Sequence, residues 1–429
     1  MIGTLPFDQD YIRQLAGNEA AWLTELRLQA LAKAEELPMP KPDKTNISKW
    51  DFVGKAGVAA GEPVRSLEEL PEDVKALLDT EENKNVLVQR SGTTAFVSLS
   101  EEAKQKGVIL TDIITAANEH AELLQKYFMK DGVKVDEHRL TALHAALLNG
   151  GAFVYIPKNV VLEAPLQSIF VVDGAEANVY NHVLLVADAN SSVTYVENYV
   201  AAEGVTGVAN IVAEVVLEQG AHVKFGAVDL LAKGITTYVN RRGVVGRDAR
   251  LEWALGLMND GDTVSENITN LVGDGSFADT KTVTIGRGEQ TQNFTTKVVH
   301  FGKHSEGWIL KHGVQKDTAT SIFNGIGKIE HGASKSNAQQ TSRVLMLNEK
   351  ARGDANPILL IDEDDVMAGH AASVGRVDPT QLYYLMSRGI PKREAERLVI
   401  HGFLAPVVNE LPVEGVKAQL VEVIERKVR

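Results

Sequence analysis

The chain has 429 residues, of which 44% are hydrophobic, enough to fill one large core or two to three domains. Its formal net charge of −13 argues against nucleic-acid binding, and the lack of cysteine excludes disulfides, thiolate catalysis and a cluster held by this chain's own sulfur. No apolar run approaches the length of a membrane span, and the first residues lack the pattern of a signal peptide, so we expect a cytoplasmic protein.

The first 150 residues are predicted to be mainly helical. The alternation of side chains in residues 85–99, around Ser91 and Gly92, predicts two short strands joined by a tight turn. The predicted helices cover residues 18–37 with Asn18 as N-cap, the segment after the Ser66–Glu69 capping box, a segment after the Ser98–Glu101 capping box, about 111–129, and about 136–149 with Gly150 at its end.

Residues 151 to about 365 are rich in β-branched residues and turn residues, with period-two alternation and hardly a helical stretch. A turn residue followed by a small residue recurs every 27 to 30 positions, at 190–191, 220–221, 248–249, 275–276, 304–305 and 332–333. Such even spacing predicts coils of about 28 residues in a parallel β-helix. A β-sandwich also has evenly spaced strands and remains an alternative.

Helical signals return near the C-terminus. Asp378 and Pro379 are predicted to begin a helix that Gly389 ends, Pro391 begins a second that Gly402 ends, and a third runs from about 414 to 429. We therefore divide the chain into a helical N-terminal region (1–150), a β-helix core (151–366) and a helical C-terminal domain (367–429).

His370 is the first candidate functional residue. It lies in the segment 364–375, where the strand pattern gives way to helices, and Ala368, Gly369 and Ala371 leave space around its imidazole. A neutral imidazole in an open setting can bind iron or zinc. The alternative is a histidine that only packs or forms a hydrogen bond at a strand end.

Other charged groups carry weaker signals. The acidic run 362–365 could bind a hard cation, but the sixth position of an EF-hand loop would be Met367 rather than glycine. His300 and His304 lie four residues apart without a third ligand nearby. A pattern of two helices joined by a turn carries four basic residues, Arg388, Lys392, Arg393 and Arg397. It resembles a DNA-binding helix-turn-helix, but we interpret it as a protein-docking surface because the whole chain is acidic. Nucleotide-binding and nucleophile-elbow motifs are absent.

Several stretches resemble one known family. They are residues 149–158, 364–375 and 378–403, together with Trp22-Leu23, Arg27 and Pro38-Met39-Pro40. In these residues the chain is similar to the SufB/SufD family of iron–sulfur cluster assembly proteins, and most similar to its SufD branch.

This resemblance implies a right-handed parallel β-helix with helical ends, acting as a non-catalytic scaffold with a SufB-like subunit and a SufC-like ATPase. It implies that His370 lies beside a SufB cysteine where the two β-helices join. There His370 is a candidate ligand of iron or of a transient cluster. This chain alone is expected to bind neither. Some family members carry a cysteine two residues before this histidine, where this chain has Ala368. A homodimer is one possible state when the partners are absent, and the sequence leaves the oligomeric state of the isolated chain open. The residues that the resemblance assigns to SufC docking are Asp378, Pro379, Tyr383, Arg388, Gly389, Pro391, Arg393, Gly402 and Phe403.

Two other functions remain open from the residues alone. One is a carbohydrate-active β-helix enzyme that uses the carboxylates of Asp362 to Asp365 as acid, base or calcium ligands. The other is a homodimeric structural protein.

Overall fold

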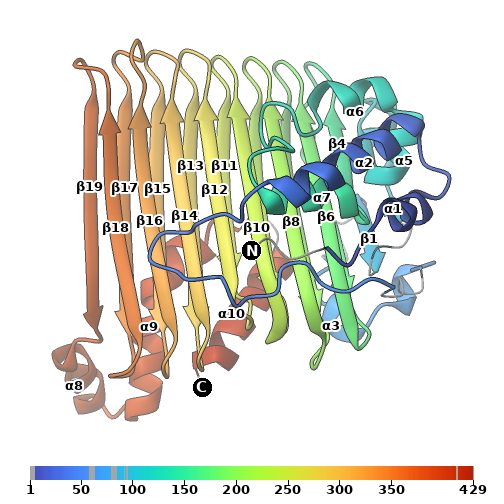
Figure 1. Ribbon diagram of the computed structural model, residues 1–429. Helices are drawn as coiled ribbons and strands as arrows, with labels where there is room; N and C mark the ends of the chain where they lie inside the picture. The colour runs from blue at the N-terminus through green and yellow to red at the C-terminus, as the bar shows by residue number, and fades with distance from the viewer. Residues whose placement is uncertain are drawn as a thin grey trace.

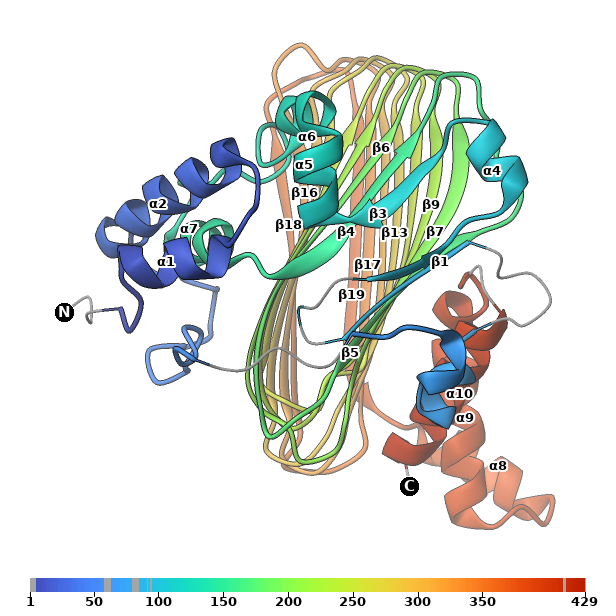
Figure 2. The same cartoon turned by 90° about the vertical axis from the view of Figure 1, so that its right-hand side faces the viewer.

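The computed structural model describes residues 5–57, 63–78, 85–90, 92, 95–411 and 414–428 (Figure 1). From β4 onward, successive strands of these residues alternate between two sheets, which face each other along a solenoid (Figure 2). All pairings between coils are parallel, so the fold is the predicted parallel β-helix. The β-sandwich alternative is wrong, because its sheets would be antiparallel.

Antiparallel pairs occur only at the N-terminal end of each sheet, within the described residues: β1 pairs with β2, and β3 with β4. The predicted pair of strands in residues 85–99 is thus confirmed; of its turn, Ser91 lies outside the described residues. The first sheet contains, in spatial order, β19 (Met367–Arg376), β17 (Asn337–Met346), β15 (Glu306–Gln315), β13 (Phe277–Gly286), β11 (Arg250–Leu257), β9 (His222–Leu230), β7 (Ser192–Ala201), β5 (Leu166–Val172), β1 (Val86–Arg90) and β2 (Phe96–Ser98). The second contains β18 (Arg352–Ile361), β16 (Thr320–Ile329), β14 (Thr291–His300), β12 (Thr263–Leu271), β10 (Gly234–Val245), β8 (Thr206–Leu217), β6 (Glu176–Ala187), β4 (Gly150–Ile156) and β3 (Ile109–Asp112).

The repeated pair of a turn residue and a small residue marks one corner of the coil. The turn residue has a positive φ, which lets the chain change sheets, and the small residue after it is buried under the next coil. This holds at 190–191, 220–221, 248–249, 275–276 and 304–305.

The last predicted repeat is out of register. Glu306 pairs with Asn337, and the hydroxyl groups of Ser305 and Ser336 lie 2.8 Å apart. The corner is therefore Lys335-Ser336 (Lys335 φ +64°) rather than Gly332-Ala333, because this turn holds three extra residues.

The interior is apolar in the first coils, where Tyr195, Phe225 and Trp253 stack in register. It also encloses a group of three charged side chains. The guanidinium of Arg241 in β10 contacts the carboxylates of Glu197 (2.7 Å) and Asp229 (2.8 Å) on the opposite sheet, and all three side chains are fully buried. This group joins the two sheets across the solenoid.

The N-terminal helices differ from the prediction in their boundaries. The helix expected over 18–37 begins at Ala21 and is not capped by Asn18. The helix expected from Thr111 begins at Ile113, because residues 109–112 form the strand β3. That helix is split at His120, and His138 rather than Asp136 caps the next one, its Nδ1 accepting the amides of Leu140 and Thr141. The helices are α1 (Gln9–Ala16), α2 (Ala21–Glu36), α3 (Glu72–Lys75), α4 (Glu101–Gln105), α5 (Ile113–Glu119), α6 (Ala121–Tyr127) and α7 (Arg139–Leu147), with a 3-10 turn at Leu67–Glu69.

Buried polar contacts fix α7 and the loop before it to the outer face of the second sheet, whereas α3 lies on the first sheet in a buried cluster with Ile169 and Val171. His144 of α7 lies 3.1 Å from His182 of β6, and His182 lies 3.0 Å from the carboxylate of Glu214 in β8. Glu214 also accepts the amides of Met129 and Val133 (2.8 and 2.9 Å). Burial and the neighbouring His182 lower the pKa of His144 well below its usual range, so His144 is neutral at pH 7.

A strap, which we define as residues 38–57, then runs along the same outer face (Figure 1). The Tyr180 hydroxyl on β6 donates to the Val53 carbonyl, and Asn293 on β14 donates to the Asp43 carbonyl (2.8 Å). Lys44 donates to Asn356 on β18. The strap thus connects the helical end of the solenoid with its last coil.

The C-terminal helices are α8 (Pro379–Ser387), α9 (Lys392–Val408) and α10 (Glu414–Val428). Figure 2 shows them on the side opposite α1, α2 and α5 to α7, where α9 and α10 pack on the first sheet. Helix α9 continues past Gly402, which was expected to end it. The helical part begins at Pro379 rather than at residue 367, because residues 367–376 form β19, and Gly150 begins β4 rather than ending a helix. None of the described helices is both long and apolar enough to span a membrane.

Candidate functional site

His370 lies within the last strand, β19, rather than after the last coil as expected. Its register places it at the end of an inward-facing row, because side chains of one register position share a face. The members before it are buried, and His370 is exposed because no described coil follows. The row consists of Leu166, Tyr195, Phe225, Trp253, Thr280, Ile309, Gln340 and His370.

The end of the solenoid around His370 is open. In the described residues β19 pairs only with β17, and β18 only with β16, so each presents one unpaired backbone edge. Unpaired edges favour pairing with another chain. Apolar side chains are exposed on the same two strands, among them Leu360, Val374 and Met367, which is 62% exposed. This end therefore has the properties of a partner surface.

The acidic run lies in the turn between β18 and β19. The carboxylate of Glu363 accepts the Gly332 amide (2.8 Å), and this bond lowers the pKa of Glu363. Asp365 forms an ion pair with Lys335 (2.8 Å). Among the described residues no three His, Cys, Asp or Glu side chains are placed to hold a metal ion. The carboxylates stabilise adjacent turns, and the calcium-ligand alternative has no geometric support.

The other histidines of the sequence analysis have structural roles. His300 is buried inside the solenoid with its Nδ1 2.9 Å from the Ser305 hydroxyl, and His304 is a turn residue. The buried contact of His144, His182 and Glu214 was not predicted. Its members are far apart in sequence, and only the register of two neighbouring coils brings them together.

Helix α8 stands away from the solenoid. Asp378 caps it by accepting the Thr380 amide (2.8 Å), Pro379 occupies its first position, and Gly389 follows it with φ +86°. No residue of α8 is buried, and Tyr383 is 72% exposed. A helix with an unpacked apolar face is typical of a docking element.

The residues assigned to docking do not all lie together. The exposed ones are Tyr383 on α8, Arg388 directly after it and Arg393 on α9. Phe403 faces the solenoid instead. Its ring stacks on that of His312 with 4.7 Å between the ring centroids, and the Nδ1 atom of His312 donates to the Phe403 carbonyl (2.6 Å).

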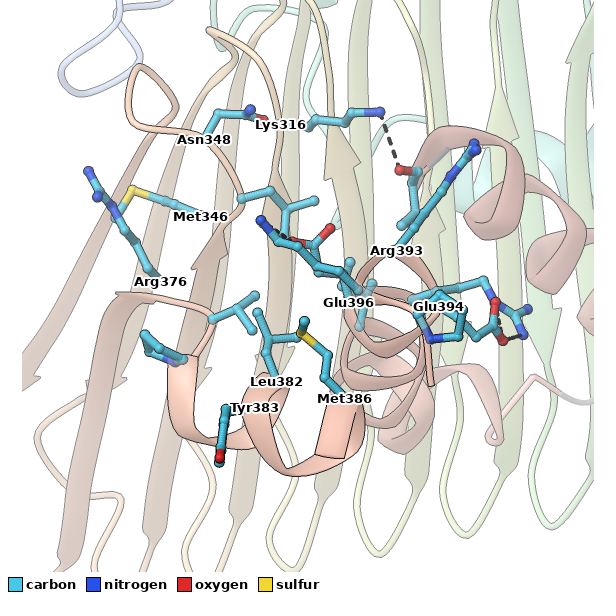
Figure 3. Close-up of a pocket in the computed structure, with 18 residues that line it drawn as sticks. Lys316, Met346, Asn348, Arg376, Leu382, Tyr383, Met386, Arg393, Glu394 and Glu396 are labelled. Carbon is cyan, nitrogen blue, oxygen red and sulfur yellow. Dashed lines mark hydrogen bonds and ion pairs between the residues drawn. The ribbon is translucent and has the colours of Figure 1, made fainter. Parts of the chain in front are cut away.

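A groove of about 1360 Å³ separates α8 and α9 from the turns after β15 and β17 (Figure 3). Leu382 and Met386 of α8 line one side, and Met346 lies on the other. Lys316 and Arg376 come from the solenoid. The groove thus combines apolar walls with cationic groups.

Helix α10 is anchored below this groove by Lys427. Its buried ammonium lies 2.6 Å from Asp260, which also binds Arg287 (2.7 Å). Burial lowers the pKa of Lys427 to about 8, although the charge of Asp260 opposes the shift.

A pH experiment tests this anchor. The folded state releases the Lys427 proton near pH 8, whereas the unfolded chain keeps it up to the ordinary value of 10.5, so the unfolded state binds more protons between these values. We expect the stability of the wild type to rise with pH relative to that of Lys427→Met between about 8 and 10.5, while Asp260 stays paired with Arg287 in both proteins. The urea midpoint of both proteins across this range measures it; an identical slope in both would contradict the assignment.

Comparisons with known proteins agree with this architecture. Residues 86–168 match the model of the SufBD protein N-terminal region, and residues 170–403 match the model described as SUF system FeS cluster assembly, SufBD core domain. The chain belongs to the SufB/SufD family. It is 67% identical, over the full length of both chains, to the iron–sulfur cluster assembly protein SufD of Bacillus subtilis. It is 27% identical to a SufBD family protein of Staphylococcus aureus strain USA300, over 95% of this chain and 90% of that one.

Within the SufB/SufD family, then, this chain presents two separate surfaces. One is the open end with His370, and the other is the groove beside α8. Strand β19 contributes to both: its unpaired edge and His370 belong to the open end, and its last residue, Arg376, lines the groove.

Proposed function

We propose that this chain is a non-catalytic scaffold subunit of SUF iron–sulfur cluster assembly in the cytoplasm. It pairs through the β18–β19 end with a SufB-like subunit and docks a SufC-like ATPase on α8 and α9. With the partner absent, the same open edges accept a second copy of the chain. Membership in the SufB/SufD family and the open end support this arrangement.

One observation carries the proposed role of His370. It is the only exposed member of an otherwise buried inward row, and it stands at the end where a partner's coil would continue the sheet. Ala368 and Ala372, its neighbours on the same face, offer no ligand atoms. His370 therefore acts as half of a ligand set for iron or a nascent cluster, and the partner supplies the thiolate.

The test is His370→Ala in a complex reconstituted with the SufB-like and SufC-like partners. We expect cluster formation, followed by absorbance and by activation of an apo-acceptor, to fall to a small fraction of the wild-type rate. The subunits should still co-elute, because the backbone edge is unchanged. His331→Ala is the matched control, an exposed histidine in the turn before β17. Full activity of His370→Ala would disprove the ligand role.

A further inference from the structure

The groove beside α8 carries a local charge opposite to that of the whole chain. Five cationic side chains and two carboxylates line it, whereas the chain has a net charge of −13. The cations are Lys316, Arg376, Lys392, Arg393 and Arg397. We propose that this groove receives an acidic element with one apolar side, presented by the docked ATPase. The inference deepens the proposed docking and rests on it.

Not all of the cations are free to meet a partner. Arg397 is held by Glu394 and Glu425, whose carboxylates raise its pKa, so it belongs to the internal contact of α9 with α10. Lys392 lies 3.8 Å from Glu396 on the same helix. These pairs account for both carboxylates of the groove.

The remaining three cations have little or no ionic compensation. Arg393 has no ion pair among the described residues, and its side chain is exposed. Lys316 is partly buried and donates to the Val428 carbonyl (3.2 Å). Arg376 lies 3.5 Å from Glu349, and the side chains of this second pair are both exposed. Because exposed pairs are weak, a carboxylate from a partner can replace Glu349 at little cost.

The three cations surround an apolar wall. Leu382 and Met386 face the groove from α8, and Met346 faces it from the last residue of β17 (Figure 3). Tyr383 extends this surface outward. A free phosphate or nucleic acid would use the cations and leave this wall exposed. An acidic protein segment with apolar residues on one side uses both, which is why we assign a protein element.

Binding of the purified SufC-like ATPase to the full chain tests the inference. We expect Arg376→Glu and Arg393→Glu each to weaken binding by about tenfold or more, mainly through slower association, and the effect to shrink at high salt. Lys130→Glu is the matched control, because it changes the net charge equally and lies in the N-terminal region, outside the groove. It should bind like the wild type.

A fourth variant separates the groove chemistry from docking itself. Tyr383→Ala is expected to weaken binding without changing its salt dependence. Tyr383→Ala could weaken binding while Arg376→Glu and Arg393→Glu bind as tightly as Lys130→Glu. That result would support docking at this surface and disprove the acidic element. If the wild-type chain fails to bind the ATPase, the proposed docking and this inference both fail. Unchanged thermal melting of each variant shows that the fold is intact.

Discussion

Replacing Arg241 by methionine is expected to lower the free energy of unfolding by about 3–5 kcal/mol. The methionine side chain fits the buried space but leaves Glu197 and Asp229 inside the solenoid without a cation. Burial and the charge of Asp229 already raise the pKa of Glu197, to about 7, so this carboxylate depends on Arg241 for its charged form. Without it, both acids must bind protons or draw in water, and either process weakens the contact between the sheets.

Arg242 provides the control for this variant. It is the next residue of β10 and points to the outer face, where it pairs with Glu137 at 2.9 Å. Arg242→Met should cost less than about 1 kcal/mol, because its partners can still reach water. Replacing the group together, with Arg241→Met, Glu197→Gln and Asp229→Asn, should recover part of the loss, because the neutral amides leave no uncompensated charge inside the solenoid. Urea midpoints measure all three, and equal losses at Arg241 and Arg242 would refute the argument.

Glu214→Gln is expected to cost about 2–4 kcal/mol, although it changes one atom. The two oxygens of Glu214 accept two amides, those of Met129 and Val133, and one also faces His182. A glutamine has one oxygen, and its amide group would point a donor at another donor. Met129 has a left-handed backbone (φ +50°), which these bonds hold in place, so the loop 129–133 should detach.

Hydrogen exchange resolves where this loss occurs. In Glu214→Gln the amides of residues 129–133 should exchange much faster, while those of the later coils stay protected. Glu218→Gln is the comparison: it lies just after the same strand and accepts one bond, from the Tyr127 hydroxyl (3.1 Å). If the amides of residues 129–133 exchange at the same rate in Glu214→Gln as in Glu218→Gln, Glu214 does not hold this loop in place.

The coil corners could be predicted because they depend on local chemistry. Positions such as Asn190, Gly220 and Asp248 need a residue that tolerates positive φ, and the next coil leaves room only for a small residue after them. The last corner could not be found in this way. Lys335 is an ordinary residue in a left-handed turn, and nearby Gly332 carries the stronger local signal.

The position of His370 was predictable, but its setting was not. Its small neighbours marked an unusual segment, which suggested the end of the sheet pattern. Those same small residues form a regular strand, because pairing with β17 decides their conformation and overrides their weak local preference. Lys392, Arg393 and Arg397 were visible as a basic cluster. Lys316 follows β15 and Arg376 ends β19, and only the folded coils bring these two beside α9.

The strap has a consequence for how this protein can change over evolution. It is fixed at Tyr180 on β6, at Asn293 on β14 and at Asn356 on β18. Inserting one repeat between these strands would move the last coil outward by about 4.8 Å, the spacing of neighbouring strands. The segment that returns from Lys44 at β18 to Val53 at β6 would then need one to two additional residues to keep its contacts. The number of coils and the length of residues 38–57 are therefore linked, and a solenoid that gains a repeat must lengthen this segment or release it.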